Sequence, residues 1–441
     1  MSTTRHVTLP AGFVAAGVKC GIKASGKPDL AIIAGEADCA CAIMTTTNQV
    51  FGEPVRWCRN VLPKGYGRIR GIVINAGCAN VCTGKAGYRD AVEMATLTAK
   101  HLSTGKQLGT VPNSGTVPTR HSGTVPPSGT VPSCTPSKVL VASTGIIGHR
   151  LPMDKVRAGI ADAAGRLGRD NDTDALHAMM TTDTRDKYAV VQEIIGGRLV
   201  TVAGIVKGAG MIAPSMATMI SVITTDAAVA PPALHKALKS AAGATFNAIT
   251  VDSDTSTSDT VVVLASGRAG NAPIPAGAWL QTAQPRRRAD YRKFAAALHE
   301  VCAALARAVA SDGEGATKLV EIAVRGARSD AEAAIAAKSV ANSPLFKCAV
   351  HGGDPNWGRI AAALGKSAAK IDPAKLVIAI GGVTLFARGA GRSFDLKKVT
   401  AHLAGGHVLV SCDLGLGAGR FTALTCDLSR EYIAINADYH T

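Results

Sequence analysis

Aromatic residues and long apolar runs are scarce in this 441-residue chain, and each scarcity counts against a class of protein. Aromatic residues make up 4% of the chain, which leaves few rings on which nucleic-acid bases could stack. No uninterrupted apolar stretch approaches the roughly 18 residues that a membrane-spanning helix needs. The opening MSTTRHVTLPAGF lacks the apolar segment of a secretion signal and the arginine-rich helix of an organelle leader, so we expect a cytoplasmic protein.

Several short motifs that mark familiar catalytic sites are also absent. The chain has no glycine-rich nucleotide loop, no His-Glu-x-x-His pair and no Gly-x-Ser-x-Gly turn. Its eleven cysteines are scattered, and neither Cys39 with Cys41 nor Cys78 with Cys82 has a second pair or a histidine segment to complete a zinc site. We interpret the cysteines as buried free thiols.

The formal net charge of +16 raises the question of a polyanionic partner. Proteins that bind nucleic acids gather lysine and arginine on one face, and often place aromatic rings among them. Here the basic residues are dispersed, and the densest run is Arg286-Arg287-Arg288. The charge therefore favours a general field that attracts small anions over a nucleic-acid interface.

Two hydrophobic periods alternate along the chain. Apolar residues recur at helical spacing over residues 153–167 and again in a second set, whereas other runs are typical of strands. The second helical set is Phe294, Leu298, Val301, Leu305 and Val309, and the strand-like runs are LVTVAGIV, VVVL, LVEIAV, LVIAIG and HVLVSC. This interleaving predicts an α/β fold in which helices cover sheets. The length predicts two domains, with a boundary after Ser311-Asp312-Gly313.

Four Gly-Thr-Val-Pro copies set one segment apart from the rest. Proline, glycine and serine in this density cannot build a core, so we predict a disordered surface insertion over residues 108–135 with no catalytic role. Directly after it, KVLVA predicts a strand that runs into STGIIG. A glycine turn at this point would expose backbone N–H groups.

The stretch KGAGMIAPSMATMISVIT, residues 207–224, contains the candidate nucleophile. Its last six residues predict a buried strand, so Thr218 would be held at the strand entrance. A threonine hydroxyl needs a base, and its own free α-amine can serve as one. That amine exists only if the Ala217–Thr218 bond is cut, for which the Thr218 hydroxyl could itself attack the Ala217 carbonyl. A packed β-branched residue is the simpler interpretation of Thr218 taken alone.

Several motifs together resemble the glutamate N-acetyltransferase/ornithine acetyltransferase (ArgJ) family of arginine biosynthesis. In chain order they are GIKASGKPDLAII, NAGCANVCTG, STGIIG, MTTDT, KGAGMIAPSMATM, FNAITVDSDTSTSDT, SDGEGATK, ANSPLFKCAVHGGDPNWGRI and INADYHT. They extend from residue 21 to the last residue. Two serines, Ser253 and Ser258, stand where the family pattern leads us to expect glycine and asparagine, and the Gly-Thr-Val-Pro insertion is foreign to it.

The resemblance implies a self-cleaving enzyme made of an α chain, residues 1–217, and a β chain, residues 218–441. It implies transfer of acetyl from N2-acetylornithine to glutamate through an acetyl-Thr218 intermediate, with acetyl-CoA as a further candidate donor. Thr144 and Gly145 would provide the oxyanion hole. Five other residues would join Thr218 in binding substrate, namely Thr181, Lys207, Glu314, Asn436 and Thr441. Thr182 and Thr184 are close enough in the chain to be the substrate contact in place of Thr181.

The same resemblance implies a fold and an assembly. The fold would be a layered αββα sandwich of the DmpA/ArgJ kind over residues 1–320, with a smaller C-terminal α/β domain over residues 321–441. The chains would form an α2β2 assembly with no metal and no bound cofactor. Asp354 and Arg359 could be mistaken for catalytic groups, but we interpret them as an Asp-Pro turn that leads into a helix.

Two other classes of function compete with the transferase. A DmpA-type aminopeptidase or amidase would use the same self-cleaved threonine with water as acceptor, and acetylornithine hydrolysis without glutamate would identify it. A non-catalytic protein that binds anions or nucleic acid would remain uncut and bind polyanions with steep salt dependence. The SDGEGATK and INADYHT motifs favour the transferase over both.

Overall fold

The computed structural model describes residues 5–104, 133–213, 219–275 and 285–438. Nearly all of the predicted insertion, Ala217, Thr218 and Thr441 lie outside these ranges. Within them, the first sheet has eight strands in the order β4-β3-β2-β8-β7-β6-β5, with β1 beside β2. The strands are β1 (Phe13–Val18), β2 (Leu30–Thr45), β3 (Tyr66–Cys78), β4 (Val139–Ile146), β5 (Tyr188–Ile195), β6 (Arg198–Lys207), β7 (Ile220–Thr225) and β8 (Thr260–Ala265).

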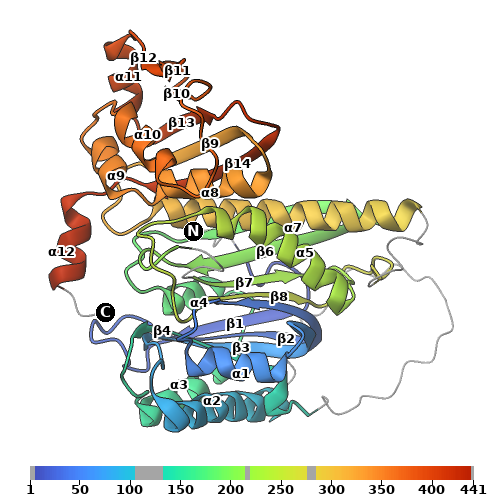
Figure 1. The fold of residues 1–441 in the computed structure, drawn as a ribbon. Coiled ribbons are helices and arrows are strands. Elements are labelled where there is room, and N and C mark those ends of the chain that lie inside the picture. Colours follow the sequence, from blue (N-terminus) through green and yellow to red (C-terminus); the bar gives the residue numbers. More distant parts are fainter. Residues whose placement is uncertain (1–4, 105–132, 214–218, 276–284, 439–441) are drawn as a thin grey trace.

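The long strand β2 divides this sheet into two layers. Its first half pairs with β1 and its second half pairs with β8, while β3 pairs with both halves and shifts register between Ala34 and Cys39. The two layers pack face to face (Figure 1). Ile33 and Ile72 from one layer share a buried cluster with Val222 and Val262 from the other. Alternation along each strand then directs the remaining apolar side chains outward.

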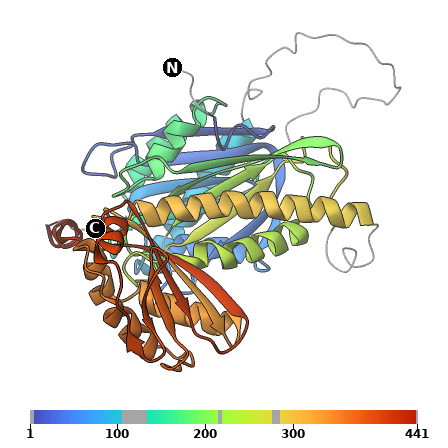
Figure 2. The same ribbon diagram turned by 90° about the horizontal axis from the view of Figure 1, so that it is seen from above.

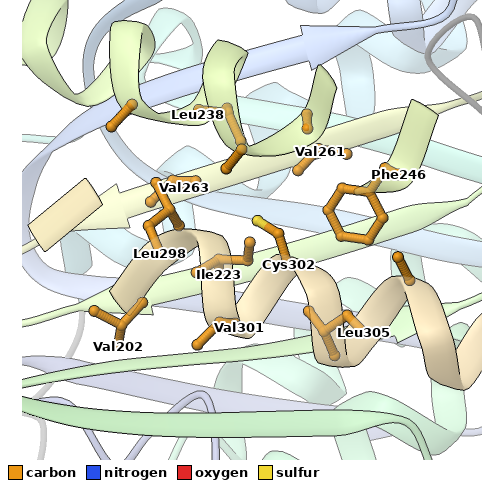
Figure 3. Close-up of a cluster of buried hydrophobic side chains, with 14 of the residues drawn as sticks. Val202, Ile223, Leu238, Phe246, Val261, Val263, Leu298, Val301, Cys302 and Leu305 are labelled. Carbon is orange, nitrogen blue, oxygen red and sulfur yellow. The ribbon is translucent and has the colours of Figure 1, made fainter. Parts of the chain in front are cut away.

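Helices cover both outer faces of the two layers. On one side, α2 (Gly84–Thr104) and α3 (Met153–Gly165) pack on the β1–β4 layer. On the other, α5 (Pro231–Ala244) and α7 (Pro285–Ser311) pack on β6, β7 and β8, where Leu238, Phe246, Val263 and Leu298 meet (Figure 3). Two shorter helices, α1 (Glu53–Val61) and α4 (Asp172–Met179), contribute to the core between the layers. The expected αββα layering is confirmed.

Helix α7 separates the sandwich from a second sheet, as Figures 1 and 2 show. That sheet has the order β12-β11-β10-β13-β9-β14. Its strands are β9 (Leu319–Ala327), β10 (Val377–Ile380), β11 (Val383–Ala387), β12 (Ala390–Gly391), β13 (His407–Asp413) and β14 (Gly419–Cys426). The predicted domain boundary between residues 320 and 321 falls within β9, near its first residue.

A third helical group accompanies the second sheet. Its members are α8 (Asp330–Ala341), α9 (Pro344–His351), α10 (Trp357–Gly365) and α11 (Leu396–Leu403), which form one core with the sheet. The Asp354–Arg359 segment leads into α10, as expected, and the Asn356 side chain caps this helix by accepting from the Arg359 N–H. The last helix, α12 (Arg430–Asp438), has no buried residues and lies outside this core.

The predicted elements agree closely with the observed ones. The helices expected at 153–167 and around Phe294–Val309 are α3 and α7, and the five strand-like runs fall in β6, β8, β9, β10 and β13. Among the described helices, α7 alone is long and apolar enough to cross a membrane by length and composition. Its apolar stripe packs in the core of the sandwich. All eleven cysteines are free thiols, and Cys82 and Cys348 are exposed, contrary to the expected burial.

Replacing Leu298 with alanine tests the packing of α7. Leu298 is fully buried, so Leu298→Ala should lower the free energy of unfolding by about 2–5 kcal/mol through lost burial and a residual cavity. Lys236→Ala, on the exposed face of α5, is the control and should change it by less than about 0.5 kcal/mol. Urea unfolding followed by circular dichroism measures both. Equal losses in the two variants would contradict this packing.

Candidate active site

Thr144 and Gly145 lie near the end of β4, which runs parallel to β3. We expected a turn here, but the strand continues through both residues to Ile146. Gly145 pairs with Gly77 and has φ +121, a conformation that side chains disfavour. A Cβ at Gly145 would collide with the Gly77 backbone and lie 2.7 Å from the Cys78 nitrogen. Two facing glycines therefore allow β3 and β4 to approach at this point.

Lys207, the last residue of β6, reaches from the second layer of the sandwich to the first. Its Nζ donates a hydrogen bond to Thr144 Oγ1 at 3.1 Å, although the two residues are 63 positions apart. An ammonium can only donate, so the Thr144 oxygen accepts and its own proton can be donated elsewhere. That arrangement suits an oxyanion-hole hydroxyl.

The charge of Lys207 is set by burial and by its neighbours. Lys207 is 6% exposed, and burial lowers its pKa below the ordinary value of a lysine, whereas nearby Asp183 opposes this shift. Its backbone pairs with Ile220 across the β6–β7 ladder. Lys207 is therefore held beside the strand that begins two residues after Thr218.

Glu314 lies in a Gly-Glu-Gly segment just after α7, and two side chains orient its carboxylate. Oε1 accepts from the Thr182 hydroxyl at 2.7 Å, and Oε2 accepts from Asn436 Nδ2 of α12 at 2.8 Å. Its backbone N–H donates to the Ala209 carbonyl at 2.9 Å. A Cβ at Gly210 would collide with the carboxylate, so this glycine makes room for it. Glu314 and Asn436, which we predict to bind substrate, are thus hydrogen-bonded to each other.

The three threonines of MTTDT have different partners. Thr182 holds Glu314, whereas the Thr184 hydroxyl donates to Asp312. The Thr181 N–H donates to Asp183 Oδ2 at 2.9 Å. Within the described ranges the Thr181 hydroxyl has no hydrogen-bond partner, so it is available to a ligand. Thr181 as the substrate contact stays a prediction, with Thr182 as the side chain that orients Glu314.

Met219 is the described residue next to the proposed nucleophile in the chain. Ala217, Thr218 and Thr441 lie outside the described residues. The residue after the nucleophile, Met219, is buried, and its N–H donates to Asp259 Oδ1 at 2.9 Å. Burial raises the pKa of Asp259 well above its usual range. Burial therefore favours the neutral form of this carboxyl group, which lies at the entrance of β7.

Sequence reasoning missed four acidic or basic residues around this site. Asp259 precedes β8, and Asp183, Lys187 and Asp312 form buried ion pairs beside Lys207 and Glu314. Asp183, Asp259 and Asp312 lie in the family motifs MTTDT, STSDT and SDGEG. Their place in these motifs could have marked them as residues of the site. The unexpected Ser253 has φ +68, which explains why glycine suits this position better.

These features define a layered α/β protein with a polar site built from several distant segments. It combines a buried ammonium next to a hydroxyl with a carboxylate fixed by two donors. Such convergent polar groups at one end of a sheet are typical of sites for small charged molecules. Among the described residues, no group of three histidine, cysteine or acidic side chains is arranged to hold a metal ion.

Comparison with known proteins identifies the family. The ArgJ family model matches residues 14–122 and 126–441. The chain is 43% identical over 440 residues to the arginine biosynthesis bifunctional protein ArgJ of Symbiobacterium thermophilum, covering 99% of this chain and 98% of that protein. It is 41% identical over 438 residues to the protein of the same name from Dehalococcoides mccartyi, covering 99% and 97%. The chain belongs to the ArgJ family, and the resemblance inferred from its motifs is confirmed.

Solved structures include a relative with the same name. The crystal structure of the arginine biosynthesis bifunctional protein ArgJ of Bacillus halodurans is 41% identical to this chain, covers 50% of this chain and 100% of its own, and has a TM-score of 0.47. A second is ornithine acetyltransferase from Mycobacterium tuberculosis complexed with ornithine, at 38% identity, 48% and 95% coverage, and a TM-score of 0.37.

Substitution of Gly145 tests the close approach of β3 and β4. Gly145→Ala should lower the free energy of unfolding by about 2 kcal/mol or more, because the new Cβ meets backbone atoms and the φ angle is unfavourable. Gly243→Ala is the matched control, since nothing lies within 4 Å of its Cβ position. Denaturant titration compares the two, and an unchanged Gly145→Ala protein would refute the clash.

Proposed function

We propose that this chain cuts itself between Ala217 and Thr218 and then moves acetyl from N2-acetylornithine to glutamate. The main support is the contact of Lys207 with Thr144, together with the pairing of Lys207 with Ile220. These contacts gather the proposed oxyanion donor and a cation next to the strand that follows Thr218. Family membership and the family motifs support the same reaction.

The self-cleavage step is an N-to-O acyl shift. The Thr218 hydroxyl attacks the Ala217 carbonyl carbon, the C–N bond breaks, and an ester joins the two chains. Water then hydrolyses the ester, leaving a carboxylate on Ala217 and a free α-amine on Thr218. That amine, with an ordinary pKa of about 7.7–8.0, is partly neutral at physiological pH and can accept a proton.

Acetyl transfer then proceeds in two steps. The Thr218 hydroxyl attacks the acetyl carbonyl, its proton passes to the Thr218 amine, and the Thr144 hydroxyl and Gly145 N–H donate to the oxyanion. The C–N bond breaks as the amine returns the proton to the departing ornithine. The amino group of glutamate attacks the acetyl ester in the same way, which releases N-acetylglutamate and restores Thr218. No step requires a metal or cofactor.

The charges around the site suit two amino acids in turn. Lys207 would bind an α-carboxylate, and Glu314 would bind the side-chain ammonium of ornithine. Thr181, Asn436 and Thr441 complete the proposed substrate contacts. We propose further that the enzyme acts in the cytoplasm as two α and two β chains, and that acetyl-CoA is a candidate second donor.

Intact-mass spectrometry of the wild type and Thr218→Ala tests the proposed nucleophile. The wild type should give two chains that meet at Ala217–Thr218, and brief exposure to N2-acetylornithine should add one acetyl group to the second. The variant should remain a single 45.0 kDa chain without an adduct, because the attacking hydroxyl is gone. An uncut wild type without an adduct would contradict the proposal. Rapid acetylornithine hydrolysis without glutamate would instead identify the hydrolase alternative.

Neutralising Glu314 tests the proposed ammonium site. Glu314→Gln should raise the KM for N2-acetylornithine about tenfold or more, because the charge partner of the side-chain ammonium is lost. Glu300→Gln, an exposed carboxylate on α7, should leave KM unchanged. Steady-state kinetics at saturating glutamate measures both. If KM is the same in both variants, Glu314 does not bind the ornithine side chain.

A further inference from the structure

Three charged side chains that the proposed reaction does not use are buried beside the site. Asp183, Lys187 and Asp312 have side chains that are 1%, 1% and 4% exposed. Lys187 Nζ lies 2.6 Å from Asp183 Oδ1 and 2.5 Å from Asp312 Oδ2. We refer to this set as the Asp183–Lys187–Asp312 triad. Buried charges are costly unless they are paired and fully hydrogen-bonded, so its further contacts indicate what it does.

The two carboxylates of the triad hold backbone from separate segments. Asp183 accepts from the Thr181 N–H at 2.9 Å and from the Gly208 N–H at 2.6 Å. Asp312 accepts from the Thr184 N–H at 3.0 Å and also from the Thr184 hydroxyl. Charge-assisted bonds of this kind are stronger than neutral ones. The triad therefore ties together residues 181–184, 207–208 and 312–314.

Each of these three segments carries a proposed substrate contact. The first carries Thr181, the second carries Lys207, and the third carries Glu314, which lies two residues beyond Asp312. Thr182 adds a direct link, because its hydroxyl donates to Glu314. A displacement of any one segment would therefore change the spacing between the proposed carboxylate and ammonium sites.

Asp183 also has a larger effect on the pKa of Lys207 than any other charged neighbour. Lys207 is influenced by Asp183, Lys187, Glu314 and Asp259, and the half-buried Lys23 also lies within its field. Burial opposes ionisation of Asp183, but the positive charges of Lys207 and Lys187 and the hydrogen bonds from Gly208 and Lys187 together lower its pKa to about 2. Asp183 is thus an anion at neutral pH and favours the ammonium form of Lys207.

We propose that Asp183 is a positioning residue, which joins the three substrate-binding segments through the Asp183–Lys187–Asp312 triad and supplies the counter-charge of Lys207. It acts through Lys207 and the backbone and does not itself touch substrate. This inference rests on the proposed function, because it assigns Lys207 the role of binding a carboxylate as a cation.

The Asp183→Asn variant keeps the shape of the side chain and removes its negative charge. An amide retains one acceptor oxygen but cannot serve both backbone N–H groups and Lys187 as the carboxylate does. It also removes the negative charge that stabilises the Lys207 ammonium, so the pKa of Lys207 falls further. The protonated form is lost as pH rises through that pKa. Carboxylate binding should therefore fail at lower pH in Asp183→Asn than in the wild type.

The experiment measures acetyl transfer from N2-acetylornithine to glutamate across neutral and alkaline pH. Wild type, Asp183→Asn and Asp170→Asn are compared as purified, mass-verified proteins. Asp170 pairs with Arg5 on the surface and is the matched control. For Asp183→Asn we expect kcat/KM to fall about tenfold or more, and its alkaline limb to move down by about one pH unit. Asp170→Asn should follow the wild type.

A second variant separates the two parts of the proposal. Asp312 pairs with Lys187, whereas Asp183 is the charge with the largest effect on the pKa of Lys207. Asp312→Asn should therefore raise the KM for N2-acetylornithine by loosening the Glu314 segment, while the alkaline limb stays in place. If Asp183→Asn does not fold, an unchanged KM in Asp312→Asn overturns the joining role of the triad.

The possible failures are distinguishable. A wild type that transfers no acetyl group overturns the proposed function itself. An active wild type with an Asp183→Asn variant that matches Asp170→Asn in rate and pH profile overturns only the role of Asp183. A lower rate with an unmoved alkaline limb overturns the counter-charge role, because a purely structural effect does not shift the titration of Lys207.

Discussion

The site depends on the hydrogen bond between the buried ammonium of Lys207 and Thr144, which joins the two sheet layers. Burial disfavours the charge of Lys207, so the surrounding structure has to supply partners for it. Thr144 supplies an oxygen from the opposite layer, and Asp183 supplies negative charge from the segment before β5. Strand β2 makes this meeting possible, because it belongs to both layers and so fixes how they stack.

Small residues allow the polar groups to approach each other closely. Gly145 and Gly77 bring the backbones of β4 and β3 together next to Thr144, and Gly210 leaves space for the Glu314 carboxylate. The chain contains 47 glycines and few aromatic residues. Side chains at these glycines would separate the strands or displace the carboxylate. The abundance of glycine therefore permits a compact polar site.

The site also depends on the far end of the chain. Glu314 follows α7, whose apolar stripe packs on the sandwich, while β9 begins the second sheet five residues later. Asn436 approaches Glu314 from α12, after the chain has completed that sheet. The carboxylate is consequently oriented by one residue before β5 and one near the C-terminus. Segments before and after the second sheet thus contribute to the same polar site.

Local pattern and motif determined much of this protein from its sequence. Apolar and β-branched runs located β4, β6, β7, β8, β9, β10 and β13, and helical spacing located α3 and α7. Motifs identified the family and pointed to Lys207, Glu314 and Asn436. Only the tertiary structure decided that β4 continues through Gly145, that Thr182 is the threonine that holds Glu314, and that Asp183 and Asp312 share Lys187. The physical reason is that hydrogen bonds and ion pairs between distant segments arise from how layers stack, and stacking leaves no periodic signal along the chain.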